Sequence, residues 1–183
     1  MKALAAAMLA LIAACGHPAP RMPSAQVQAQ IDQAEAAERA RQHDLARGHY
    51  QRAVAEAADP PSIAFARREY AETLITWGEI PEAIAQLEVA VTAAPKDAAA
   101  WHDLGILRHN QGDDVRALDA LEHAREASPR DPRPRIALAA LRWSRGDRAG
   151  ATTEYKALLE LELPDRLRDK VKWALGELAK PKP

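Results

Sequence analysis

Residues 98–131 read AAAWHDLGILRHNQGDDVRALDALEHAREASPRD, and this stretch decides the fold because its pattern recurs along the chain. Five independent positions return at an interval of 34 residues. They are Gly78, Gly112 and Gly146; Ala83, Ala117 and Ala151; Ala71, Gly105 and Ala139; Leu87, Leu121 and Tyr155; and Pro95 and Pro129. A fixed period of this length is typical of proteins that stack one small structural unit several times.

Each recurring position has a physical role in a pair of helices. The small residues allow two helices to cross closely, and the recurring glycines permit the left-handed backbone that ends the first helix of a pair. Asp113 or Asp114, and Asp147, are placed to cap the second helix. Pro95 and Pro129 stop the second helix, since proline cannot extend it.

The central stretch resembles a tetratricopeptide repeat (TPR), whose pattern is W-x₂-L-G-x₂-Y, then A-x₃-F, then P. The matching residues are Trp101, Leu104, Gly105, Ala117, Leu121 and Pro129, and the departure is Arg108 where the pattern has Tyr. The resemblance implies an all-α fold, a TPR-type α-solenoid of antiparallel helix pairs with a C-terminal capping helix. We expect nine helices and no strand; an unrelated helical bundle is the alternative.

Full copies are expected at 64–97, 98–131 and 132–165, and a degenerate copy at 27–60, so that the solenoid covers 26–165. Ala46 precedes Ala83 by 37 residues, and Asp59-Pro60-Pro61 accounts for the extra three. Residues 166–183 are a capping helix and tail, in which Asp165 caps the helix. Its apolar stripe consists of Leu167, Val171, Leu175 and Leu178.

The N-terminal sequence predicts where in the cell the protein is located. Lys2 precedes twelve apolar residues, Ala3 to Ala14, too short a run to span a bilayer, so residues 1–14 read as a signal peptide. Ile12-Ala13-Ala14-Cys15 resembles the bacterial lipobox, which implies lipidation of Cys15 and membrane attachment through the lipid anchor. Residues 15–25 then form a Pro-rich tether. An ordinary secretory signal with an incidental cysteine is the alternative.

Charge and motif content argue against catalysis and against nucleic-acid binding. Lys and Arg number 25 against 26 Asp and Glu, which excludes a strongly basic chain. The single cysteine excludes an internal disulfide and a multi-cysteine metal site. No phosphate loop, G-x-S-x-G or H-E-x-x-H motif occurs, and His102 and His109 are too far apart on a helix to share a metal. We therefore expect no enzyme activity, no cofactor, no metal and no small-molecule substrate.

The resemblance also implies a concave groove, lined by the first helix of each pair, that takes a protein or peptide partner. Stepping by 34 residues places nine residues in this groove: Arg68, Glu72, Ile75, His102, Ile106, His109, Ile136, Ala140 and Trp143. The row is charged at its N-terminal end and apolar at its C-terminal end. Two questions stay open: whether the capping helix covers Ile136 and Trp143, and whether Trp173 is a second contact point or folds over the rim.

The groove does not match the family's carboxylate clamp, because Glu72 and Asp103 stand where the clamp needs neutral donors and Ala137 replaces a base. The predicted function is a lipid-anchored scaffold or assembly factor of the bacterial cell envelope, of the pilotin, secretion, pilus or outer-membrane assembly type. Gly16 favours the outer membrane, facing the periplasm. The alternative is a regulator that activates an envelope enzyme such as a peptidoglycan synthase or hydrolase.

Overall fold

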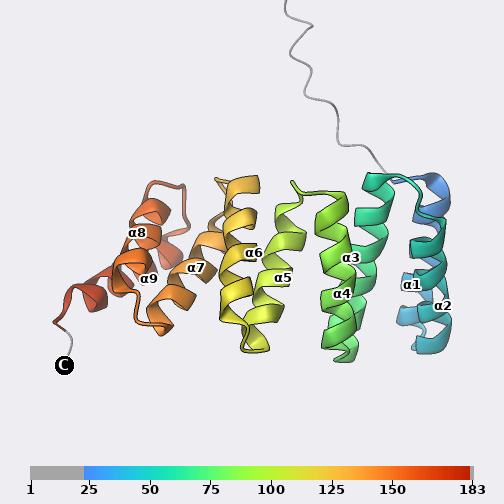
Figure 1. Ribbon diagram of the computed structural model, residues 1–183, viewed down its shortest axis with the longest axis horizontal. Coiled ribbons are helices and arrows are strands. Elements are labelled where there is room, and N and C mark those ends of the chain that lie inside the picture. Colours follow the sequence, from blue (N-terminus) through green and yellow to red (C-terminus); the bar gives the residue numbers. More distant parts are fainter. Residues whose placement is uncertain (1–22, 182–183) are drawn as a thin grey trace, which may run out of the picture.

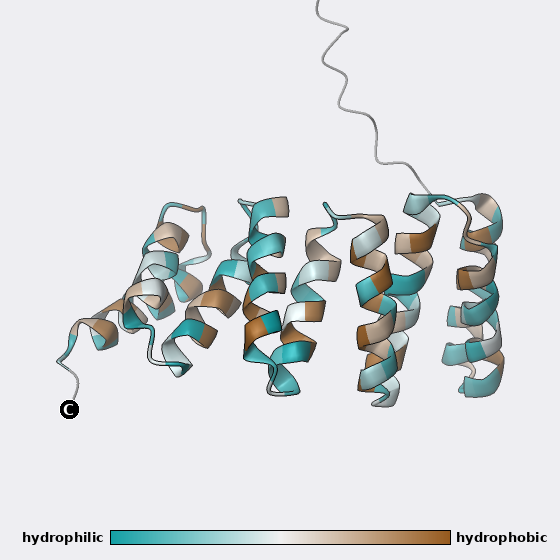
Figure 2. Cartoon of the chain, viewed as in Figure 1, coloured by the Kyte–Doolittle hydropathy of each residue, from teal (hydrophilic) through white to brown (hydrophobic). Residues whose placement is uncertain are grey.

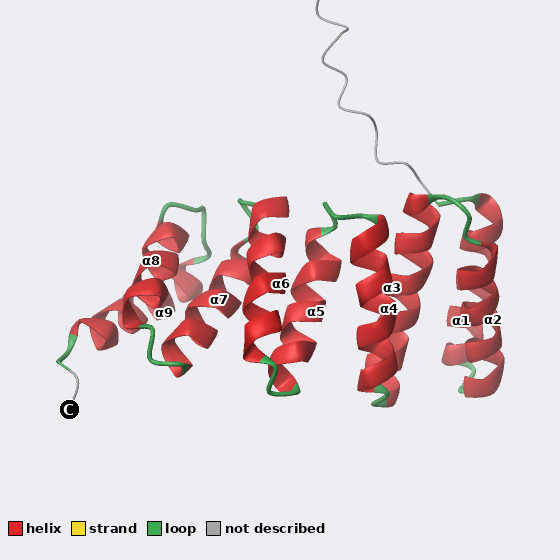
Figure 3. Ribbon diagram, viewed as in Figure 1, coloured by secondary structure: helices red, strands yellow, loops and turns green. Residues whose placement is uncertain are grey.

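The computed structural model describes residues 23–181, and within that range it contains nine helices and no strand, as the repeat pattern predicts (Figures 1 and 3). Four antiparallel pairs stand side by side in chain order, and the ninth helix closes the row. The helices are α1 (Ala25–Arg39), α2 (His43–Glu56), α3 (Pro60–Trp77), α4 (Ile80–Ala93), α5 (Ala98–Asn110), α6 (Asp114–Ala127), α7 (Pro132–Ser144), α8 (Arg148–Leu159) and α9 (Asp165–Ala179).

The turns inside the last three pairs form as predicted. Gly78, Gly112 and Gly146 have φ values of 80°, 79° and 82°, in the left-handed region where a side chain would be strained. Asp113 and Asp147 accept hydrogen bonds from the backbone at the starts of α6 and α8. The capping role predicted for Asp165 is wrong, because α9 already begins at that residue and no side chain caps it.

The small recurring residues lie where helices cross. Ala83, Ala117 and Ala151 are fully buried, as are Ala71 and Ala139. The crossing at Gly105 has no room for a side chain, since a Cβ atom there would lie 2.7 Å from Leu121 Cγ. The buried side chains follow the row of helices in three neighbouring clusters, so each pair packs chiefly against its neighbours.

Each helix carries both hydrophilic and hydrophobic residues along its length (Figure 2). Among the described residues, none of the helices has the length and apolar character needed to cross a membrane. The predicted lipobox and the predicted signal peptide lie outside the described residues.

The three extra residues between Ala46 and Ala83 lengthen a helix instead of a loop. α3 has 18 residues against 13 in α5, and it starts with Pro60 and Pro61 in its first turn. The buried Ser62 hydroxyl donates to Asp59 Oδ2 at 2.7 Å and accepts from the Ser24 backbone N–H at 2.9 Å. The insertion therefore fastens the start of α1 to the start of α3.

Ion pairs connect successive repeats in the same 34-residue register. Arg108, which stands in place of the pattern's tyrosine, binds Glu88 on α4, and Arg142 on α7 binds Glu122 on α6 in the equivalent way. A buried carboxylate strengthens the second junction, since Glu154 on α8 is 3% exposed. Its oxygens accept from Arg125 and Arg135 at 2.7 and 3.0 Å, and Arg142 lies 3.7 Å away.

Candidate functional site

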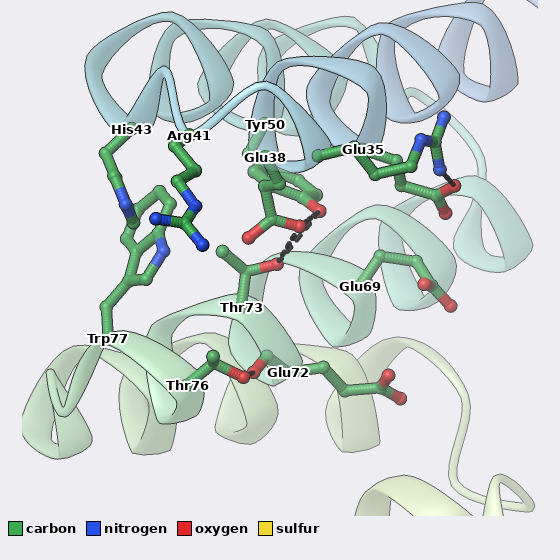
Figure 4. Close-up of a pocket in the computed structure, with 11 residues that line it drawn as sticks. Glu35, Glu38, Arg41, His43, Tyr50, Glu69, Glu72, Thr73, Thr76 and Trp77 are labelled. Carbon is green, nitrogen blue, oxygen red and sulfur yellow. Dashed lines mark hydrogen bonds and ion pairs between the residues drawn. The ribbon is translucent and has the colours of Figure 1, made fainter.

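A cleft with a volume of about 850 Å³ opens between α1 and α3, at the N-terminal end of the row (Figure 4). Helix α1, the turn after it, α2 and α3 all contribute side chains to the cleft. The lining residues are Glu35, Glu38, Arg39, Arg41, His43, Tyr50, Glu69, Glu72, Thr73, Thr76 and Trp77.

A hydrogen-bonded centre holds the middle of this α1–α3 cleft. The Tyr50 and Thr73 hydroxyls lie 3.0 and 3.2 Å from Glu38 Oε2, and 2.9 Å from each other. Burial raises the pKa of the Tyr50 phenol, so Tyr50 stays a donor at neutral pH. Burial also raises the pKa of Glu69, an effect that the neighbouring Arg68 guanidinium opposes.

The two ends of the α1–α3 cleft differ in chemistry. Figure 4 shows His43, Arg41 and Trp77 at one end, and Glu35, Glu69 and Glu72 toward the other. The Trp77 ring is fixed between the Arg47 guanidinium, 4.8 Å from its centroid, and the His43 ring at 5.3 Å. Arg39 is already paired with Glu35 at 3.4 Å. The cleft is aromatic at one end and acidic at the other.

A smaller pocket of about 380 Å³ opens at the C-terminal end, between α7 and α9 over α8. Trp143 lies at its centre, with its ring 6.2 Å from Tyr155 in an edge-on arrangement and 6.4 Å from Trp173. Trp173 is 64% exposed. The lining residues of this α7–α9 pocket are Ile136, Trp143, Tyr155, Leu167, Lys170, Val171, Trp173 and Ala174.

The structure does not bring the nine predicted groove residues into one cavity. Glu72 lines the α1–α3 cleft, whereas Ile136 and Trp143 line the α7–α9 pocket. Ile75 and Ile106 are partly buried against the core, and Ala140 is exposed. Both possibilities considered for Ile136 and Trp143 hold in part, since they pack against the cluster that includes α9 and still line an open pocket.

Arg68, His102 and His109 of the predicted set already have polar partners. Arg68 pairs with Glu69 at 3.0 Å. The His102 ring lies 3.1 Å from Asp103, and the His109 ring lies 2.8 Å from Asp114. Within residues 23–181, no group of three or more His, Cys, Asp or Glu residues could hold a metal ion. Partner binding by the nine residues stays a prediction.

Solved structures with the same arrangement of helices settle the fold. The MamA protein superimposes with a TM-score of 0.70 over 84% of this chain and 80% of MamA, at 17% identity. The fold is that of a TPR solenoid. The structure from the functional characterisation of Pseudomonas aeruginosa PilF gives a TM-score of 0.65 at 16% identity, over 84% of this chain and 73% of PilF.

A third TPR neighbour was solved with a peptide in place. It is the Yersinia enterocolitica type III secretion chaperone SycD in complex with a peptide of the translocator YopD. The TM-score is 0.56 at 17% identity, over 61% of this chain and 88% of SycD. At these identities the likeness concerns the fold alone.

Sequence comparison adds one curated relative, the TPR repeat-containing protein PA4299 of Pseudomonas aeruginosa. It is 34% identical over 108 residues, which cover 59% of this chain and 43% of the relative. The chain thus matches less than half the length of this relative. No protein-family model matches the chain.

Sequence reasoning missed the α1–α3 cleft of the TPR solenoid. Its first copy is degenerate, and although Tyr50 fits the register of the second helix, the predicted groove residues were taken from the three full copies alone and so did not include Glu38 or Tyr50. The role of Trp173 was also left open, although its spacing from Lys170 and Arg166 indicates that the three side chains share one face of a helix.

Proposed function

We propose that this TPR solenoid is a non-enzymatic interaction scaffold, lipid-anchored in the bacterial cell envelope through Cys15, that captures a segment of a partner protein. The observation that carries the proposal is the open α7–α9 pocket, in which Ile136, Trp143 and Trp173 present apolar surface on a rigid row of helices. Open apolar surface with a charged rim is typical of sites that bind protein segments.

The geometry of this pocket fits a short apolar anchor. The Trp143 ring is held by its contacts with Tyr155 and Trp173, so little order has to be imposed on it when a segment binds. Lys170 supplies one cation at the edge, suited to a backbone carbonyl or an acidic side chain of the bound segment. The occupant would therefore insert one or two large apolar side chains.

Two further observations support the proposal. The first is the pair of structural neighbours SycD and PilF, of which SycD was solved with a peptide of the translocator YopD. Ile12-Ala13-Ala14-Cys15 follows a short apolar run as in lipoprotein signal sequences. A lipid-anchored assembly factor at the outer membrane, facing the periplasm, combines these features. A regulator of a peptidoglycan synthase or hydrolase is the second candidate, and the identity of the captured partner separates the two.

The test is partner capture in cells by a photo-crosslinking amino acid placed at Lys170, with Val115 as the control position because Val115 is 71% exposed on α6 and lines none of the five pockets described for the chain. One defined partner should be captured from Lys170 and not from Val115. Introducing Ile136→Ser and Trp143→Ala into the Lys170 probe should abolish that capture while helical circular dichroism is retained. Capture that is undiminished in the folded double variant would refute the pocket as the binding site.

A further inference from the structure

A basic and aromatic stripe of exposed side chains runs along α9, and two of its members, Lys170 and Trp173, also line the rim of the α7–α9 pocket. Arg166, Lys170 and Trp173 are all exposed and stand at i, i+4 and i+7, so they share one face of the helix. The stripe is about 10 Å long, with its two cations first and the indole last. Within residues 23–181, Trp173 is the one Trp, Tyr or Phe side chain in the exposed class.

Charge is distributed unevenly along the solenoid. Residues 23–127 contain 18 Asp and Glu against 10 Lys and Arg, a net charge of −8. Residues 128–181 contain 12 Lys and Arg against 8 Asp and Glu, a net charge of +4. The near-neutral chain is therefore acidic at the end that holds the α1–α3 cleft and basic at the end that holds α9.

We propose that the solenoid associates head to tail, with the α9 stripe of one copy docking in the α1–α3 cleft of the next. The order of charged and aromatic groups along the α9 stripe matches the order of acidic and aromatic groups along the α1–α3 cleft. Trp173 would reach the aromatic end beside Trp77, and the cations Arg166 and Lys170 would face the acidic end. A helix laid in a groove with its anchors at i, i+4 and i+7 is a common mode of recognition.

The carboxylates at the acidic end are accessible to such a helix. Glu72 is 54% exposed and lies 4.0 Å from Arg68, and Glu35 is 44% exposed and pairs with Arg39 at 3.4 Å. The cleft volume of about 850 Å³ leaves room for an indole and the stem of a lysine. Desolvating these carboxylates against two cations strengthens the attraction that the net charges provide at longer range.

The contact has to be between molecules, because α1 and α9 lie at opposite ends of the row (Figure 1). It is also heterologous, since each copy offers one cleft and one stripe that are different surfaces. Such an interface does not close on itself in a dimer and can add further copies in a line. The inference goes beyond partner capture and needs no other protein.

Sedimentation velocity of purified residues 16–183, which contain every described helix, tests the proposal. The mean mass should rise with protein concentration at low ionic strength and return to that of a monomer at high salt. A tail variant, Lys170→Ala with Trp173→Ala, should self-associate at least about 30-fold more weakly. A head variant, Glu35→Lys with Glu72→Lys, should lose association to a similar degree, and Lys96→Glu, in the loop before α5, is the control substitution.

Mixing the two variants gives the decisive result. The head variant keeps an intact stripe and the tail variant keeps an intact cleft, so an equimolar mixture should form a 1:1 dimer that does not grow. A wild-type chain that stays monomeric at submillimolar concentration and low salt, or a mixture that stays monomeric, overturns the proposal. Lys170 and Trp173 belong to both surfaces, so the identity of the crosslinked protein separates the two proposals: a second copy of this chain reports self-association, and a different protein reports partner capture in the α7–α9 pocket.

Discussion

Asp131 begins α7 and holds an arginine at the same time. Its Oδ1 accepts the Arg133 backbone N–H at 2.9 Å, and its Oδ2 lies 2.7 Å from the Arg133 guanidinium. These hydrogen bonds to Arg133 lower the pKa of the Asp131 carboxyl. The ionised form is thus stabilised by folding, and the extra stability is present above the ordinary pKa of an aspartate and disappears as the pH falls through the lowered value.

We predict that Asp131→Ala lowers the free energy of unfolding by about 1 kcal/mol at pH 7, the usual cost of losing an N-cap. The difference from wild type should shrink as the pH is taken below about 4, because the Asp131 carboxylate of the unfolded chain is protonated first and that of the folded protein follows as the pH falls through its lowered pKa. Urea titrations at several pH values measure both quantities.

Asp131→Asn is the matched control, since an amide oxygen can still cap the helix without carrying charge. It should cost less than the alanine variant at pH 7. An alanine variant whose deficit is as large at pH 3 as at pH 7 would show that the ionised carboxylate contributes nothing to the cap.

The glycines inside helices predict opposite effects on stability at the level of the element. Replacing a helical glycine by alanine ordinarily stabilises the helix by about 1 kcal/mol. At Gly105 in α5 the new Cβ would lie 2.7 Å from Leu121 Cγ and 3.2 Å from the Ala117 carbonyl oxygen, and Leu121 is itself buried. We expect Gly105→Ala to destabilise the protein by about 1–3 kcal/mol through overpacking.

The control for this prediction is Gly48→Ala in α2, where a Cβ meets no atom within 4 Å. Gly48→Ala should leave stability unchanged or raise it by up to about 1 kcal/mol. Thermal unfolding of both variants makes the comparison. Equal effects at the two positions would mean that the α5–α6 crossing has room to spare and that the small residue of the repeat is not required.

The helices of the repeats were predictable because their signals are local. Gly112 and Asp113 set a turn and a cap within two residues, and each fixes its backbone independently of the rest of the chain. Relations between elements outside the register were not predictable. Pro164 lies one residue beyond the position that the 34-residue interval from Pro129 predicts. The rotation of α9 about its axis therefore does not follow from the repeat, and this rotation sets the direction of Trp173.

The α1–α3 cleft was not predicted, for a related reason. It depends on how α1 packs against α3, and the tie between Ser24 and Ser62 that fastens these two helices lies in the stretch where the period breaks. More of the apolar half of the candidate site could be predicted. Ile136 lies on α7, one of the helices that keep the repeat register, and it lines the α7–α9 pocket. Whether that pocket binds a partner depends on a second molecule, and no motif in this sequence identifies that molecule.

At the scale of the whole molecule, the proposed anchor predicts where the protein is found. Cys15→Ser should abolish incorporation of a labelled fatty acid and release the protein from the membrane fraction, because two or three acyl chains provide stable attachment and none would remain. Metabolic labelling followed by fractionation measures both. Labelling that persists in Cys15→Ser would contradict the anchor.

Gly16→Asp provides the companion variant. In lipoproteins of this kind an aspartate after the modified cysteine often signals retention at the inner membrane, so this variant should keep its acyl label and change its membrane. The pair of variants separates the chemistry of attachment from the choice of membrane.

The placement of the four tryptophans has a spectroscopic consequence. Trp77, Trp101, Trp143 and Trp173 lie on α3, α5, α7 and α9, so each occupies a different segment of the row. In a repeat protein whose segments contact mainly their neighbours, unfolding can start at one end and spread. Four variants that each retain a single indole would therefore let intrinsic fluorescence follow the spread of unfolding along the solenoid, without any added dye.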